Sequence, residues 1–77
     1  MAQLYFDCSG ATGVLLDRRG RPVADLDEAR EHAARLVMGL IATPSEEDWR
    51  DWVMHVSDEE GEEVLEVAFS SLLGRPH

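Results

Sequence analysis

Apolar residues recur with a helical period between Asp25 and Ala42, and with a period of two on either side of that segment. Asp25 and Glu28 form the carboxylate version of a capping box, and Thr43-Pro44 ends the run because proline has no amide hydrogen to donate. The apolar side chains of the segment fall on one stripe: Leu26, Ala29, Ala33, Leu36, Val37 and Leu40. The pattern predicts an amphipathic helix that needs a packing partner.

Two or three short strands are predicted before this helix. Residues 3–8 alternate between apolar and polar, and the side chains expected to face the core are Leu4, Phe6 and Cys8. The glycines of residues 9–13 indicate a turn, and residues 14–16 a second strand. Residues 17–20, with the form Asp-x-x-Gly, predict a tight turn, because aspartate can accept hydrogen bonds from amides ahead of it and glycine tolerates the left-handed region. Residues 21–23 are a candidate edge strand.

A second hairpin is predicted after the helix, with a second Asp-x-x-Gly turn at residues 58–61. The side chains expected to face the core are Trp52, Met54, Val56, Leu65, Val67 and Phe69. We therefore predict a single α+β domain over residues 1–73, in which two β-hairpins form one antiparallel sheet of about four strands. A single α-helix packs on one face of this two-layer fold, in the order β-β-α-β-β. Residues 74–77 are expected to be a flexible tail.

The charge of the chain narrows the range of partners. Its 77 residues include 16 acidic and 7 basic residues, which give a net charge of −9. This charge repels a phosphate backbone and an anionic membrane, so we expect no direct nucleic-acid binding and no membrane association. The single cysteine, Cys8, permits no disulfide within the chain, and no apolar run is long enough to span a membrane. A cytoplasmic location is expected.

Several of these positions together resemble a known family. The residues that carry the resemblance run from about Leu4 to Phe69: Tyr5, Phe6, Gly13, Asp17-x-x-Gly20, Asp25-Leu26-x-x-Ala29, Val56-x-Asp58-x-x-Gly61, Leu65, Val67 and Phe69. The chain resembles a family of short bacterial proteins, common in proteobacteria, that is described only as a domain of unknown function. The matching positions are turns, caps and core residues. The resemblance therefore implies a fold and carries no activity, cofactor or ligand.

No catalytic or metal-binding motif stands out along the chain. The acidic run at residues 58–63 is interpreted as a solvated turn, because neighbouring residues of a hairpin point in opposite directions and few could reach one cation. The histidines, His32, His55 and His77, lack the spacing of helical metal ligands. His55 near Ser57 or Ser70 lacks a recognisable nucleophile elbow. We predict no catalytic residue, no cofactor, no metal and no small-molecule ligand, and we interpret Cys8 as a core residue.

The outer face of the predicted sheet is the candidate partner surface. The residues expected there, with Trp49 at its margin, are Tyr5, Leu15, Val53, His55, Val64 and Ala68. So much apolar surface on an exposed face suggests a partner. A homodimer through this face or through an unpaired edge strand is the leading structural hypothesis, and the alternative is that Trp49 and the flanking loops fold over the face.

The functional hypotheses follow from this surface and the charge. The first is a non-enzymatic protein-interaction or regulatory module. The alternative is an acidic adaptor or decoy that binds a basic protein through residues 46–48 and 58–66. A second alternative is a small metal-binding protein or enzyme.

Overall fold

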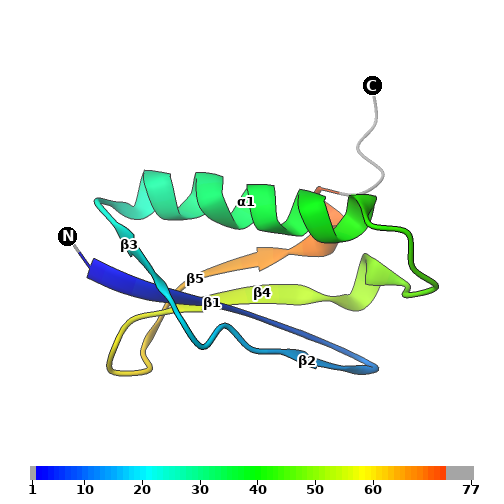
Figure 1. Cartoon of the computed structure of the whole chain (residues 1–77), viewed down its shortest axis with the longest axis horizontal. Coiled ribbons are helices and arrows are strands. Elements are labelled where there is room, and N and C mark those ends of the chain that lie inside the picture. The colour runs from blue at the N-terminus through cyan, green and yellow to red at the C-terminus, as the bar shows by residue number, and fades with distance from the viewer. Residues whose placement is uncertain (1, 73–77) are drawn as a thin grey trace.

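The helix lies across one face of an antiparallel sheet in a two-layer α+β arrangement, as predicted (Figure 1). A computed structural model describes residues 2–72, and the tail at residues 74–77 lies outside them. The elements in chain order are β1 (Ala2–Gly10), β2 (Gly13–Leu15), β3 (Arg21–Val23), α1 (Leu26–Ala42), the 3-10 turn η1 (Trp49–Asp51), β4 (Val53–Ser57), β5 (Glu63–Ala68) and the 3-10 turn η2 (Phe69–Ser71). The described sheet has five strands, one more than the four expected.

Strands β2 and β3 both pair with β1, and the rest of the sheet follows in the order β1-β4-β5. Cys8 pairs with Leu15, and Leu4 pairs with Arg21. Between these two pairs β1 advances by four residues and the returning chain advances by six, so the returning chain carries two extra residues. The Asp17–Gly20 turn is therefore an insertion between two strands that pair with β1, and it does not create a separate hairpin.

The Asp17 carboxylate holds this insertion against β1. The backbone N–H groups of Arg19 and Gly20 donate to its Oδ1, at 3.1 and 3.0 Å, and Gly20 has the positive φ of 73° that the turn requires. The N–H of Phe6, in the middle of β1, donates to its Oδ2 at 3.1 Å. The side chain thus replaces a backbone acceptor where the strand pairing is interrupted, since a strand amide left without a partner would be costly.

The ends of α1 are where the sequence predicts them. Oδ1 of Asp25 accepts a hydrogen bond from the N–H of Glu28 at 2.8 Å, which confirms the N-terminal cap. At the other end the hydroxyl and the N–H of Thr43 both donate to the carbonyl of Gly39. Within residues 2–72, no helix is long and apolar enough to cross a membrane.

The buried face of α1 is narrower than the predicted stripe. Ala29, Ala33 and Val37 are fully buried, and their i, i+4 spacing places them in one line along the helix. Leu26 and Leu36 flank this line and stay exposed, so their prediction as buried residues is wrong. Small alanines bring the helix close to the sheet, and the larger leucines are then left at its sides.

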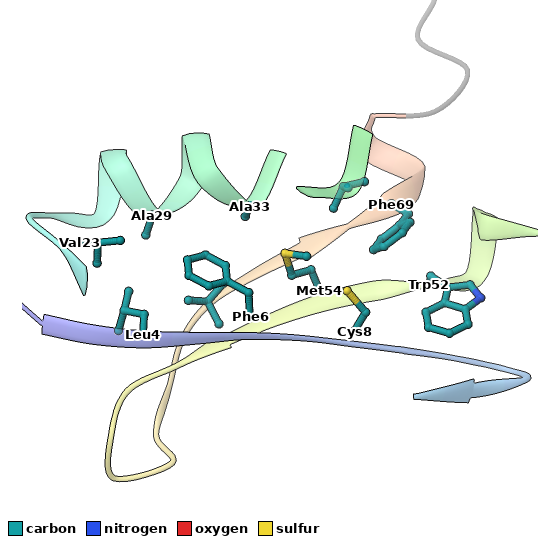
Figure 2. Packing of buried hydrophobic residues seen from close by; sticks show 11 residues of the cluster. Leu4, Phe6, Cys8, Val23, Ala29, Ala33, Trp52, Met54 and Phe69 are labelled. Carbon is teal, nitrogen blue, oxygen red and sulfur yellow. The ribbon is translucent and has the colours of Figure 1, made fainter. Parts of the chain in front are cut away.

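The core lies between α1 and the sheet, as predicted for Phe6, Met54 and Phe69 (Figure 2). The buried residues are Leu4, Phe6, Cys8, Val23, Ala29, Ala33, Val37, Trp52, Met54, Val56 and Phe69. Leu65 and Val67 are only partly buried and pack against this cluster. Phe69 begins the turn η2 and does not extend β5, yet it is completely buried.

Candidate functional site

The outer face of the sheet holds four of the seven predicted partner residues, but it is more polar than predicted. Tyr5, Val53, His55 and Ala68 alternate with buried neighbours and pair across the strands on the side away from α1. The cross-strand neighbours on this side are polar or charged: Asp7, Ser9, Ser57, Glu63 and Glu66. The expectation of a largely apolar outer face is therefore wrong.

Leu15, Val64 and Trp49 lie elsewhere. Leu15 is paired with the buried Cys8 and faces the same side of the sheet as α1. Val64 lines a shallow groove with Leu4 and residues 23–26 on the helix side. Trp49 stacks on Phe69, with ring centroids 5.6 Å apart, and its ring contributes to the core.

A cluster of four side chains occupies the outer face around His55. Nε2 of His55 lies 3.2 Å from the hydroxyl of Ser9, on the neighbouring strand β1. Nδ1 lies 2.6 Å from Oε1 of Glu63 and 3.5 Å from Oε2 of Glu66, both on β5. The imidazole side chain is 36% exposed, so solvent reaches the cluster. Residues from three strands thus converge on one ring.

A β-bulge makes this convergence possible. Glu63 and Glu66 are three positions apart, and in a regular strand they would point to opposite faces. The pairing register shifts between Val56 and Ser57, so that Ser57 pairs with Glu63 whereas Val56 pairs with Leu65. Val64 is the extra residue of the bulge. The same irregularity therefore moves Glu63 onto the outer face and Val64 to the helix side.

The order Ser9, His55, Glu63 matches the order of groups in a hydrolytic triad, but the surroundings do not support acyl transfer. Ser9 pairs with Val14 on one side and Val53 on the other, so its backbone N–H belongs to the sheet and is not free to bind an oxyanion. The apolar groove between β2 and the C-terminal half of α1 lies on the opposite side of the sheet. The chemistry best suited to the cluster is the binding of a cation between one imidazole nitrogen and two carboxylates.

An apolar groove lies on the helix side, between β2 and the C-terminal half of α1. It encloses a volume of about 470 Å³, and most of its lining is apolar: Phe6, Cys8, Leu15, Leu16, Leu36, Gly39, Leu40 and Met54, with Asp17, Arg35 and Thr43. Partial burial alone would raise the pKa of Asp17, but the hydrogen bonds from the amides of Gly20, Phe6 and Arg19 lower it below its ordinary value. Asp17 therefore stays ionised at the rim of the groove.

The remaining candidate residues have structural surroundings. Burial, and to a lesser extent the charge of Asp7, raise the pKa of the Cys8 thiol to about 11, which fits its interpretation as a core residue. Burial and the nearby Arg21 and Arg35 lower the pKa of His32, whose ring meets Phe6 edge-on at 4.8 Å. In the acidic turn, Oδ1 of Asp58 accepts the N–H groups of Glu60 and Glu62, so this carboxylate is used by the turn itself.

Comparison with known proteins identifies a family and nothing more specific. A family model described as "Domain of unknown function (DUF6894)" matches residues 3–70. No curated protein and no solved structure shows a significant match to the chain. The match spans the helix and the described strands except for Ala2 at the start of β1, and the family description states no activity.

Proposed function

The chain belongs to the DUF6894 family of domains of unknown function, and from its surfaces we propose that it is a non-enzymatic protein-interaction module. The partner that we propose is a basic, amphipathic segment of another protein, which binds in the groove between β2 and α1. The observation that carries the proposal is the exposure of leucines along this groove. We place the module in the cytoplasm, since its single cysteine needs no oxidising compartment.

The groove leaves large apolar side chains facing solvent from two elements. Leu15 and Leu16 come from the β2 side, Leu36 comes from α1, and all three are exposed. Leu16 is 63% exposed. Full burial of a leucine side chain contributes about 1.5–3 kcal/mol, so covering the exposed part of Leu16 alone would contribute about 1–2 kcal/mol. A groove that gathers several such residues is a suitable site for the apolar face of a partner.

Charge selects the kind of partner. The net charge of −9 attracts a basic segment at long range and repels a second copy of the same chain. We therefore commit to a basic partner and not to a homodimer. This combines the two leading hypotheses from the sequence, because the acidic surface steers the partner and the apolar groove holds it.

The test is selection from a displayed library of random peptides, with the full chain as bait and fluorescence anisotropy of the enriched peptides as the readout. We expect the enriched peptides to combine apolar residues at helical or alternating spacing with lysine or arginine. The double variant Leu16→Ser with Leu36→Ser should weaken their binding at least about tenfold, given about 1–2 kcal/mol for Leu16 and about 0.5–1 kcal/mol for Leu36, which is 37% exposed. Added salt should weaken binding further.

Val14 provides a matched control. Its exposed fraction of 60% is similar to the 63% of Leu16, but Val14 pairs with Ser9 and so lies on the outer face. Val14→Ser should leave peptide binding unchanged. Equal binding by the wild type and the Leu16/Leu36 variant, or enrichment of acidic peptides, would reject the proposal. A dimer in sedimentation that is lost in this variant would assign the groove to a second copy instead.

A further inference from the structure

We propose that the outer face binds one divalent transition-metal ion of the Zn²⁺ type, through Nδ1 of His55 and one carboxylate oxygen each from Glu63 and Glu66. The three donor atoms lie within 4.8 Å of one another. This site is separate from the groove, because it lies on the other side of the sheet. It also differs from the acidic turn at residues 58–61, which supplies none of the three donors.

The short distance between Nδ1 of His55 and Glu63 requires either a hydrogen-bonded proton or a metal ion between the two atoms. Nδ1 and Oε1 of Glu63 are 2.6 Å apart, and two lone pairs that face each other at this distance would repel. Either a proton on Nδ1 or a metal ion must therefore occupy the space. A metal ion forms bonds of about 2.0–2.2 Å to each donor and in tetrahedral geometry separates the donors by about 3.3–3.6 Å. The separation of 3.5 Å from Glu66 already suits this arrangement, and Glu63 needs a small rotation.

Ser9 supports the ring orientation that metal binding needs. Its hydroxyl lies 3.2 Å from Nε2 and can accept the proton of that nitrogen, so that in the metal-bound state the lone pair of Nδ1 is available to the ion. A hydrogen bond to the second ring nitrogen is the usual outer contact of a metal-bound histidine. Ser9 is a positioning residue here and not a ligand.

The donor set and the backbone indicate the class of metal. One imidazole nitrogen and two carboxylates favour first-row divalent ions, whereas Mg²⁺ and Ca²⁺ prefer oxygen donors alone. All three donors are side chains of the paired strands β4 and β5, which hold their positions. The side chains of Glu63 and Glu66 are 49% and 58% exposed, so the remaining coordination positions are open to water or to a donor from a partner.

The test is titration of the full chain with ZnCl₂ alone, and isothermal titration calorimetry measures the binding. We expect one saturable site in the wild type and a loss of affinity of at least about tenfold in His55→Gln and in the double variant Glu63→Gln with Glu66→Gln. The double variant Glu59→Gln with Glu60→Gln removes the same charge from the same hairpin and should bind as the wild type does. Circular dichroism should show that each variant is folded.

Two further measurements make the outcome decisive. Zn²⁺ should raise the melting temperature of the wild type and not that of His55→Gln, because only a folded state with the site is stabilised by the ion. Ser9→Ala should weaken Zn²⁺ binding by about tenfold, as loss of an outer contact usually does. Absence of a saturable site, unchanged affinity in His55→Gln, or equal affinity for Mg²⁺ would overturn the metal site. Unchanged affinity in Ser9→Ala would overturn the role given to Ser9.

Discussion

Replacing Asp17 with alanine should cost about 2.5–3 kcal/mol of folding free energy, a large share of the roughly 4–10 kcal/mol expected for a chain of this size. The carboxylate accepts three backbone amides, from Phe6, Arg19 and Gly20. The amide of Phe6 lies in β1, where the Asp17 side chain replaces a missing strand partner. We therefore expect the loss of this hydrogen bond to cost about 1.5–2 kcal/mol. The other two amides lie in the turn itself, where the hydrogen bond from Arg19 is exposed and the one from Gly20 is partly buried, so together they contribute about 1 kcal/mol.

The second Asp-x-x-Gly turn supplies the comparison for this value. Asp58 accepts the amides of Glu60 and Glu62 in an exposed hairpin turn and bridges no interruption in the sheet. Asp58→Ala should therefore cost only about 1 kcal/mol. Urea unfolding followed by tryptophan fluorescence measures both variants. A loss in Asp17→Ala that is no larger than the loss in Asp58→Ala would refute the claim that Asp17 completes the sheet.

The pH dependence gives a second check on Asp17. Its pKa is lower in the folded protein than the value of about 4 expected for an unfolded chain. The carboxylate therefore contributes its full stability above about pH 5, and the contribution is lost as the pH falls through the unfolded pKa and then through the lower folded pKa. The difference in unfolding free energy between the wild type and Asp17→Ala should narrow between about pH 5 and pH 3. A difference that stays constant over this range would contradict the assigned ionisation.

Two further predictions concern residues near the core. Gly10→Ala should destabilise the fold by about 1–3 kcal/mol in urea unfolding, because the new Cβ would lie 2.4 Å from the indole of the buried Trp52. Gly13→Ala is the control and should destabilise the fold far less, because its Cβ would have no neighbour within 4 Å. Cys8 should resist alkylation by iodoacetamide at pH 7 in the folded state and react readily in urea, because burial raises its pKa to about 11 and thiolate is the reactive form. Rapid labelling of the native protein would contradict its buried position.

The parts of the fold that the sequence predicts well are those that local chemistry determines. The Asp25 cap, the end of the helix at Thr43 and the glycine at position 20 each depend on residues within one turn of chain. The inward side of β1 and β4 also follows from regular alternation. These features need no knowledge of which strand pairs with which.

The errors occur where the pairing register decides the outcome. Residues 14–16 are all apolar, so their sequence holds no alternation from which to assign a face, and only the pairing of Leu15 with Cys8 places it on the helix side. A bulge moves Val64 to the helix side, and no turn-forming residue in the sequence indicates this bulge. The His55 cluster was missed for the same reason: Ser9 and His55 are 46 residues apart, and Glu63 joins them only through the register of β5. The bulge brings the two glutamates and the histidine together, and this can be inferred only once the pairing of the strands is known.

The two proposed sites lie on opposite faces of one sheet, and this arrangement makes them separately testable. The zinc ligands come from β4 and β5 on the outer face, whereas the groove leucines come from α1 and the β2 side on the inner face. Substitutions that share no contacts usually act additively. The Leu16/Leu36 serine variant should therefore bind Zn²⁺ like the wild type. The Glu63/Glu66 glutamine variant should lose Zn²⁺ binding. Because this variant also lacks two negative charges, its peptide binding should decrease only in the salt-dependent part. If either variant lost both kinds of binding while circular dichroism showed it to be folded, the claim that the two sites are independent would be wrong.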